Sequence, residues 1–391
     1  METPDFQLAR LTSDADVVVP EEELRERLAE GKPLRVKLGM DPTAPSVTLG
    51  WAVVLRKLRQ FQELGHTAVL IVGDFTAQVG DPSGKSETRR RLSEAEVRGY
   101  ADELLDQFSR VLLPDPLEIR YNSEWLSALT MADVLELTSK TTVAQMLERE
   151  DFRNRFDTGQ PISTMEFMYP LLQGYDSVAV DADIELGGSD QLWNNMMGRV
   201  LMDRYGKRGQ MVLTMPLLVG TDGVQKMSQS LGNYVGVTDE PPEMFGKIMS
   251  IPDPLMRSYF ELLTDLEPAD VNDILAGHAG EAKRRLAREI VTTFHDEPAA
   301  AEAEEAFDRV FKQRQAPEDM DSFPLDKSDP VFLPALIVTA GLTSSSSEAR
   351  RMLSQGAVKV DGVKVAEEQV ARADLAGRVL QVGKRRFIRL T

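Results

Sequence analysis

The sequence feature that most constrains the fold is an alternation of short β-branched runs with longer amphipathic stretches over roughly the first 220 residues. Runs with strand character predict strands at residues 35–38, 67–72, 117–121 and 212–219. Helical spacing predicts helices between them at residues 53–63, 93–111 and 131–149. This alternation predicts an α/β fold with a Rossmann-like parallel sheet and right-handed crossovers.

Three segments in post-strand positions are rich in Gly, Asp and Thr. They read GMDPT at 39–43, GDFT at 73–76 running into GDPSGK at 80–85, and GGSDQ at 187–191. Ligands of open parallel sheets bind beyond the carboxyl ends of the strands. We therefore expect these three segments to converge on one crevice that carries the chemistry.

The rest of the chain divides into further regions. From residue 241 to about 312 the pattern is helical, with helices expected at 282–294 and 299–311. Residues 313–330 hold three prolines and many acids without periodicity, which predicts a linker. The tail predicts a helix at 333–340, a second helix capped by the serines at 344–347, and strands at 358–364 and 379–389 with a hairpin turn at Asp361-Gly362. The predicted domains are a catalytic domain (1–219), a signature loop with an all-α domain (220–312), the linker (313–330) and a small α+β RNA-binding module (331–391).

The charge of the chain is unevenly distributed. The net charge is −18, which argues against nucleic acid if it is spread evenly. Residues 331–391, however, hold ten Lys or Arg and five Asp or Glu. A basic module on an acidic body is typical of a polyanion-binding appendage, because phosphate neutralisation supplies most non-specific affinity for nucleic acids. Charge alone is equally consistent with a solvated basic surface.

Composition also narrows the class of protein. The chain has no cysteine and only three histidines, so we expect no metal site built from protein ligands. No apolar stretch approaches the roughly 18 residues that a membrane span needs. The N-terminal segment is acidic and lacks the basic-then-apolar order of a signal peptide. We expect a cytoplasmic protein that does not contact membranes.

Two common nucleotide-binding motifs do not fit. Residues 80–86 read GDPSGKS, but a phosphate loop requires glycine six positions before Lys85, where Val79 stands. No Gly-x-Gly-x-x-Gly follows a predicted strand either, which argues against a dinucleotide oxidoreductase.

An ordered set of longer motifs runs along most of the chain. It comprises KLGMDPTAPSVTLGW (37–51), KLRQFQELGH (57–66), VGDFTAQVGDPSGKSETR (72–89), YNSEWL (121–126), TVAQMLEREDFRNRF (142–156), EFMYPLLQGYDS (166–177), GGSDQLWN (187–194), MPLLVGTDGVQKMSQSLGNYVG (215–236) and MFGKIMSIPD (244–253). This set resembles bacterial tyrosyl-tRNA synthetases, class I aminoacyl-tRNA synthetases of the type with a small C-terminal RNA-binding module. The resemblance implies a tyrosine–tRNA ligase that uses ATP.

The resemblance implies an amino-acid pocket lined by Tyr169, Gln173, Asp176 and Gln191. Asp176 would accept a hydrogen bond from the substrate phenol, while Tyr169, Gln173 and Asp81 would hold the ammonium group. A buried carboxylate left unpaired by phenylalanine would reject that amino acid by orders of magnitude. Taken singly, Tyr169 and Gln173 fit a helical core face equally well, and only the joint order of the motifs favours the functional interpretation.

For the nucleotide, the resemblance implies that Gly187, Gly188 and Asp190 meet the ribose. Lys85 and Arg89 would hold the pyrophosphate leaving group, and Lys226 and the hydroxyl of Thr43 would complete the catalytic set. The further ATP-binding candidates lie in the two signature segments, and they are Gly39, Asp41, Thr48, Gly50, Trp51, Met227 and Ser228.

Both signatures depart from the family pattern. The two histidines of the "HIGH" signature are replaced by Thr48 and Trp51, and the second lysine of "KMSKS" is replaced by Gln229. Losing one such transition-state contact typically costs about 10²–10³ in rate. Two hypotheses therefore stand: an active ligase with a rebuilt phosphate site, or an impaired paralogue that binds tyrosine or RNA without adenylation.

The resemblance also implies partners. It predicts a homodimer with the TVAQMLERED segment (142–151) at or near the interface, binding to tRNA(Tyr), and Mg²⁺ accompanying ATP, held mostly by phosphates and water. The basic tail would hold tRNA through Arg350, Arg351, Lys384, Arg385 and Arg386.

Overall fold

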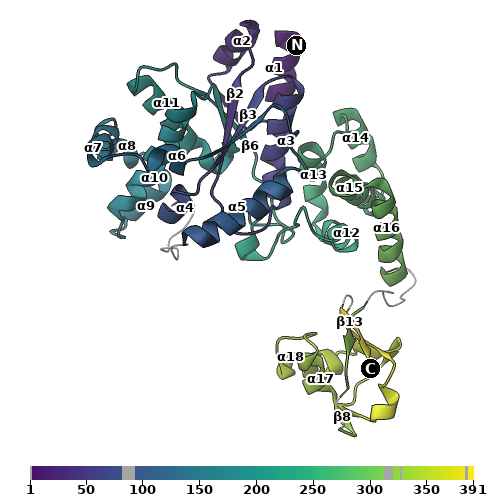
Figure 1. Ribbon diagram of the computed structural model, residues 1–391. Coiled ribbons are helices and arrows are strands. Elements are labelled where there is room, and N and C mark those ends of the chain that lie inside the picture. Colours follow the sequence, from purple (N-terminus) through teal and green to yellow (C-terminus); the bar gives the residue numbers. More distant parts are fainter. Residues whose placement is uncertain (1, 82–92, 312–319, 326–327, 384–385) are drawn as a thin grey trace. The chain divides into compact units, whose positions relative to one another are not determined.

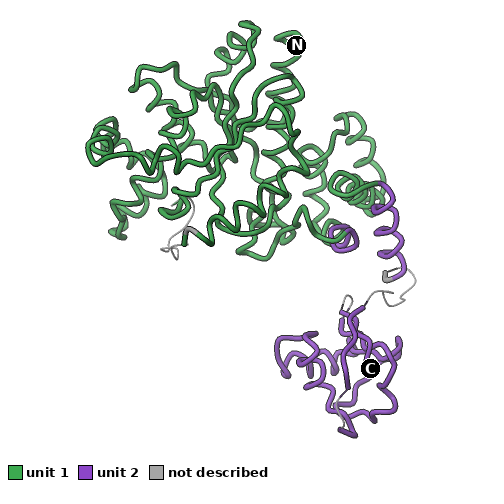
Figure 2. The backbone as a smooth tube through the Cα atoms, in the orientation of Figure 1, with its two compact units in different colours: residues 1–240, 247–296 green, residues 241–246, 297–391 purple. Residues whose placement is uncertain are grey.

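The computed structural model describes residues 2–81, 93–311, 320–325, 328–383 and 386–391. The chain forms two compact units, coloured separately in Figure 2. The first comprises residues 1–240 and 247–296, and the second comprises residues 241–246 and 297–391. Each unit is described below by itself.

The first unit is built on a six-stranded sheet with the strand order β1-β6-β5-β2-β3-β4. All neighbouring strands are parallel except β1 and β6, which are antiparallel. The sheet confirms the predicted Rossmann-like parallel core. Its strands are β1 (Val17–Val19), β2 (Arg35–Met40), β3 (Thr67–Val72), β4 (Leu117–Tyr121), β5 (Ile184–Gly188) and β6 (Met211–Met215).

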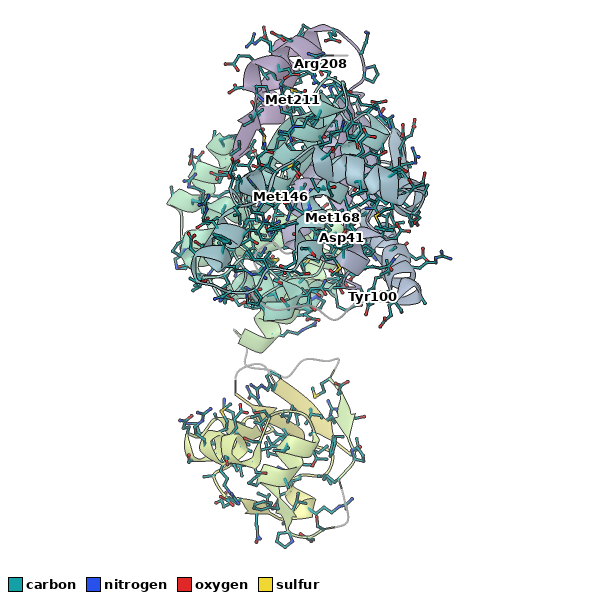
Figure 3. All side chains as sticks on the ribbon, turned by 90° about the vertical axis from the view of Figure 1, so that its left-hand side faces the viewer. Asp41, Tyr100, Met146, Met168, Arg208 and Met211 are labelled. Atoms are coloured by element: carbon teal, nitrogen blue, oxygen red, sulfur yellow. The ribbon has the colours of Figure 1, made fainter. Side chains whose placement is uncertain are left out.

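The order of the strands reverses between β2 and β5. From β2 the chain proceeds outward to β3 and β4, and it then returns to add β5 and β6 on the other side of β2. Ligands of such sheets bind at this reversal, beyond the carboxyl ends of the strands. Met211, where β6 begins, and Asp41, which follows β2, lie at opposite ends of the sheet (Figure 3).

The central strands are buried on both faces. In β3, with the sequence TAVLIV, every residue after Thr67 is buried, as expected of a parallel strand covered by helices. Figure 1 shows α10 and α11 on one side of the sheet and α3 with α1 on the other. The helices of this part are α1 (Pro4–Thr12), α2 (Glu21–Ala29), α3 (Leu49–Glu63), α4 (Thr76–Val79), α5 (Glu94–Phe108), α6 (Ser123–Leu126), α7 (Met131–Ser139), α8 (Val143–Met146), α9 (Glu150–Asp157), α10 (Thr164–Val180), the 3₁₀ turn η1 (Ser189–Gln191) and α11 (Leu192–Arg204).

Most predicted elements of this unit are present, and one is wrong. The expected single helix at 131–149 is two helices, α7 and α8. Thr142 begins the second helix, because its hydroxyl accepts from the Gln145 backbone N–H and the Gln145 side chain accepts from the Thr142 N–H. The strand expected at 212–219 ends at Met215, before the signature loop.

Helices without long strands follow the signature loop, as predicted. They are η2 (Gln229–Leu231), α12 (Pro241–Ser250), η3 (Asp253–Leu255), α13 (Met256–Leu263), α14 (Pro268–Ala276) and α15 (Ala279–Phe294), and in the second unit α16 (Glu297–Phe311). Residues 241–246 of α12 belong to the second unit. None of the helices in the described part of the chain is long and apolar enough to span a membrane.

The tail module folds around its own apolar core, which includes Leu333, Ile337 and Val358. Both residues of the predicted Asp361-Gly362 turn have positive φ, at 45° and 80°, as a tight hairpin requires. Ser345 caps the second helix, as predicted from the serine run. The elements are β7 (Ser322–Phe323), β8 (Val331–Phe332), α17 (Leu333–Thr339), α18 (Ser346–Ser354), β9 (Val358–Val360), β10 (Val363–Lys364), β11 (Gln369–Val370), η4 (Arg372–Asp374), β12 (Val379–Val382) and β13 (Arg386–Leu390).

Part of the segment expected to be a linker belongs to this module. The strand β7 pairs in parallel with β13, and Leu325 is buried in the same core. Two residues are too few to give a strand periodicity, so the sequence carried no signal for this pairing.

Candidate active site

A cleft of about 590 Å³ lies at the carboxyl ends of β2, β3 and β5. It brings together all the amino-acid and nucleotide candidates that fall among the described residues of the catalytic unit. These are Gly39, Asp41, Thr43, Thr48, Gly50, Trp51, Asp81, Tyr169, Gln173, Asp176, Gly187, Gly188, Asp190, Gln191, Lys226, Met227 and Ser228. Lys85 and Arg89 lie outside the described residues. The three Gly- and Asp-rich segments therefore share one crevice in their described parts.

Asp41 joins three elements at the floor of the cleft. Its Oδ1 accepts a hydrogen bond from Thr76 Oγ1 at 2.7 Å, and its Oδ2 accepts one from the Tyr169 hydroxyl at 2.9 Å. Gly73 passes so close that an added Cβ would lie 2.0 Å from Asp41 Oδ1 and 2.4 Å from Thr76 Oγ1. Only glycine fits at this position without moving the carboxylate.

Asp176 is held by two donors from the segment after β4. Its Oδ1 accepts from Trp125 Nε1 at 2.8 Å, and its Oδ2 accepts from Asn122 Nδ2 at 3.3 Å. The side chain is 3% exposed, yet it lines the cleft. A carboxylate oxygen can accept more than one hydrogen bond, so Asp176 retains capacity for a ligand hydroxyl.

The carboxyl groups of Asp41 and Asp176 both have a raised pKa. Burial raises the pKa of Asp41 to about 7, against the lowering effect of its bonds to Thr76 and Tyr169. Burial likewise raises the pKa of Asp176 to about 7, and the charge of Lys37 opposes the rise. Carboxyl groups that titrate near neutral pH inside a cleft are typical of functional sites.

A second polar cluster lies beside Asp81. Gln191 Nε2 donates to Asp81 Oδ2 at 3.0 Å, and Asn194 Nδ2 donates to Gln191 Oε1 at 3.1 Å. Arg149, from the segment between α8 and α9, donates to Asn194 Oδ1 at 3.2 Å and lies 3.9 Å from Asp81 Oδ1. The sequence interpretation gave Arg149 no role, because a lone arginine in an acidic helical segment is most often a surface charge.

Behind the cleft lies a buried ion pair between neighbouring strands. Lys37 on β2 and Glu185 on β5 face each other in register, with 2.9 Å between Nζ and Oε1. Gln173 Nε2 donates to the same Glu185 oxygen at 3.2 Å. Glu185, Asn122 and Trp125 were also given no role from sequence, because each acts by supporting a neighbour and no local pattern marks such contacts.

The part of the cleft that holds the nucleotide candidates is lined by backbone and by the ion pair of Lys226 with Asp190. A Cβ added to Gly39 would meet no atom within 4 Å, so the backbone there is open to a ligand. Gly187 and Gly188 are tightly enclosed by Asn195 and Leu217, among others. Lys226 Nζ lies 2.7 Å from Asp190 Oδ2 at the rim.

The three residues that depart from the signatures all line the cleft. Thr48 precedes α3 and is buried. The Trp51 ring lies 6.0 Å from the Phe108 ring, tilted by 40°. Gln229 Nε2 donates to the Ser46 carbonyl, which ties the signature loop to the segment between β2 and α3.

The structure describes some of the RNA-binding candidates in the tail module. Arg350 forms an ion pair with Glu368 at 3.2 Å, and Arg386 lies 3.6 Å from Glu348. Both side chains are about half exposed, and Arg351 is exposed. Lys384 and Arg385 lie outside the described residues. Within the described ranges, no group of three or more His, Asp or Glu side chains could hold a metal ion.

Two protein families and several tyrosine–tRNA ligases are similar to this chain. The family "tRNA synthetases class I (W and Y)" matches residues 29–312, and the S4 domain matches residues 333–370. The tyrosine–tRNA ligase of Moorella thermoacetica is 52% identical over 98% of this chain and 95% of its own length. That of Deinococcus radiodurans is 49% identical over 95% of this chain and 93% of its own length.

Among solved structures, a tyrosyl-tRNA synthetase from Archaeoglobus fulgidus in complex with L-tyrosine is 24% identical, with a TM-score of 0.61, and covers 76% of this chain and 99% of that one. A truncated mitochondrial tyrosyl-tRNA synthetase from Aspergillus nidulans has a TM-score of 0.65 at 20% identity and covers 80% of this chain and 95% of that one. At this identity the structures show the shared fold. Taken with the sequence matches, they lead to one conclusion: the chain belongs to the tyrosyl-tRNA synthetase family of class I tRNA synthetases and carries an S4 domain.

Proposed function

We propose that this chain is a tyrosine–tRNA ligase, which activates tyrosine with ATP to tyrosyl-adenylate and transfers the tyrosyl group to the 3′ end of tRNA(Tyr). One observation carries the proposal. The cleft ends at a buried carboxylate, Asp176, which Trp125 and Asn122 hold in place with capacity left for a phenol hydroxyl.

The amino acid fits the inner part of the cleft. Asp176 accepts a hydrogen bond from the phenol hydroxyl. The ammonium group is bound by Asp81, Tyr169 and Gln173, and Gln191 orients Asp81. The Oε1 atom of Gln173 is buried and has no hydrogen-bond partner among the described residues, which suits an acceptor that awaits a substrate donor.

ATP occupies the outer part in this proposal. The backbone at Gly39 is open to the nucleotide, Gly187 and Gly188 at the end of β5 line the same cleft without a side chain, and Asp190 meets the ribose. Thr43 and Lys226 contact the phosphates, together with Lys85 and Arg89 from the segment outside the described residues. Mg²⁺ accompanies ATP, held by phosphate oxygens and water.

The first reaction needs no proton transfer. The tyrosine carboxylate oxygen attacks the α-phosphorus in line, the bond from that phosphorus to the bridging oxygen breaks, and pyrophosphate leaves with the electron pair. The protein then contributes position and charge stabilisation. In the second reaction the terminal ribose hydroxyl of tRNA attacks the tyrosyl carbonyl, and AMP leaves.

The altered signatures favour a rebuilt phosphate site in this account. Thr48 retains a hydroxyl, and Trp51, already packed near Phe108, offers a ring face to the adenine. The second hypothesis, a paralogue without adenylation, is favoured by one feature. Gln229 supplies no positive charge, and its amide is engaged by Ser46.

Exchange of labelled pyrophosphate into ATP separates the two hypotheses. We expect exchange that depends on tyrosine with the purified chain, because the amino-acid end of the cleft is complete. Tyrosine binding without any exchange would select the paralogue. A chain without residues 331–391 should retain exchange and lose most aminoacylation, since the basic tail serves only the tRNA step.

We further propose that the chain is a homodimer in the cytoplasm. Large apolar side chains on α7, α8 and α9 are exposed, including Met131 at 74% and Phe156 at 61%. Phe156 and Val143 line a groove of about 350 Å³ together with Leu147 and Phe167, among others. Exposed patches of this kind mark protein interfaces. Light scattering should show a dimer for the parent chain and a monomer for Phe156→Asp, and a monomeric parent chain would contradict the proposal.

A further inference from the structure

The buried pair of Lys37 and Glu185 has no role in the reaction as proposed. Both side chains lie at the reversal point of the sheet, on the paired strands β2 and β5, at 0% and 1% exposure. Buried ion pairs contribute little stability over apolar replacements of similar volume. A pair placed directly behind the amino-acid site therefore calls for another explanation.

The hydrogen bonds of the Lys37 ammonium are satisfied within the protein. Its Nζ donates to Glu185 Oε1 at 2.9 Å, to the Gln173 carbonyl at 2.9 Å and to Ser177 Oγ at 2.8 Å. An ammonium group has three donors, so none is left for a substrate. Lys37 is therefore not a phosphate-binding cation. It fixes the turn of α10 that carries Gln173 and Asp176.

Glu185 in turn fixes the side chain of Gln173. Its Oε1 accepts from Gln173 Nε2 at 3.2 Å, while its Oε2 accepts from Ser177 Oγ at 3.1 Å and from Gln210 Nε2. The Gln173 Nε2 atom also lies 3.1 Å from the amide of Asn195. With its NH₂ group engaged by Glu185, Gln173 has only its oxygen to offer, on a side chain that lines the cleft.

We propose that Lys37 and Glu185 are a positioning pair, which holds the Gln173 amide so that its oxygen is presented to the ammonium group of the amino-acid substrate. This inference rests on the proposed function and adds two residues to its recognition of the ammonium group. Lys37 touches no substrate atom. Lys37 neutralises Glu185 and fixes the turn of α10 that carries Gln173. Without Lys37, the Gln173 amide would turn its NH₂ group toward the substrate ammonium group and repel it.

The test replaces both charges together, as Lys37→Met with Glu185→Leu, because removing one alone leaves a buried unpaired charge. Calorimetry then compares two ligands that share the phenol: tyramine, which carries the ammonium group, and 3-(4-hydroxyphenyl)propionate, which lacks it. We expect tyramine binding to weaken by about 10- to 150-fold, the range for a hydrogen bond to a charged group. The propionate should change by less than about threefold.

A mutant cycle that combines the double variant with Gln173→Met shows whether Lys37 and Glu185 act through Gln173. The triple variant should bind tyramine no more weakly than Gln173→Met alone, since coupled residues are non-additive. Lys283→Met with Asp253→Asn removes a Lys–Asp ion pair in the helical region, where the aspartate is 60% exposed, and it should leave both ligands unchanged. Equal weakening of both ligands by the double variant, or additive losses in the cycle, would overturn the proposal.

Ser177→Ala serves if the double variant does not fold, because it removes one bond from each partner of the pair and keeps the charges. It should weaken tyramine binding selectively, by a smaller factor, and equal weakening of both ligands would again overturn the inference. A parent chain that binds neither ligand would instead refute the proposed function.

Discussion

Replacing Asp176 with asparagine should abolish most of the preference for tyrosine over phenylalanine. The substitution keeps the size of the side chain and removes its charge. In the parent chain, both carboxylate oxygens already accept from fixed donors, at 2.8 Å from Trp125 and 3.3 Å from Asn122, and the phenol hydroxyl is the further donor. An amide has a single acceptor oxygen, so its NH₂ group must face one of those donors.

The magnitude follows from the lost hydrogen bond. A hydrogen bond to a charged group contributes about 1.5–3 kcal/mol, which corresponds to about 10- to 150-fold in the ratio of kcat/KM for tyrosine and phenylalanine. We expect most of the loss in KM for tyrosine, because the phenol lies far from the reacting carboxylate. Phenylalanine should be activated no worse than by the parent chain, since its ring no longer buries an unpaired carboxylate.

The assay is pyrophosphate exchange driven by each amino acid in turn. Asp190→Asn is the matched control, because it removes a carboxylate from the nucleotide end of the same cleft. It should raise KM for ATP and leave the preference for tyrosine intact. An unchanged preference in Asp176→Asn, or an equal loss in both variants, would refute the reasoning.

Four further predictions concern the same cleft. Tyrosine should bind more tightly in calorimetry as the pH rises through about 7, because Asp176 then loses its proton and accepts from the phenol, while Asp41 loses its proton and holds Tyr169; a flat profile would contradict this. Since both pKa values lie above the ordinary value of 3.8, the folded state holds protons that the unfolded state releases, and denaturation should show stability falling as the pH rises from about 4 to about 7. Gly73→Ala should raise KM for tyrosine about tenfold by displacing Asp41, whereas Gly99→Ala on α5, where an added Cβ meets no atom within 4 Å, should be neutral. Trp51→Ala should weaken ATP binding about tenfold and Trp51→Phe much less, and equal effects would argue against stacking.

Much of the catalytic fold could be predicted from sequence because its signals are local. The strands at 67–72 and 117–121 were predicted with the bounds that the structure gives, and the first of them reads as a continuous apolar run because β3 is buried. The described parts of the three Gly- and Asp-rich segments lie at one crevice because parallel strands end at a common edge. The break after Ser139 was missed, because helical spacing continues across it while the cap at Thr142 starts a new helix.

The residues that hold the candidate ligand-binding side chains in place could not be predicted from the sequence. Glu185 reads as one polar residue in a buried strand, and only the pairing of β5 with β2 places it against Lys37. Arg149 approaches the cleft from the segment between α8 and α9, and Trp125 from the short helix α6, and both positions depend on tertiary packing. Candidate ligand contacts could be proposed from the motifs, whereas the hydrogen bonds that orient them join segments far apart in the sequence.

A crystal structure of the chain with tyrosine and a non-hydrolysable ATP analogue tests the central claim most directly. The account predicts the phenol oxygen within about 3 Å of an Asp176 oxygen and the ammonium group beside Gln173 Oε1, with the carboxylate facing the α-phosphate. Tyrosine bound with its ring directed away from Asp176, or at a site outside this cleft, would contradict it.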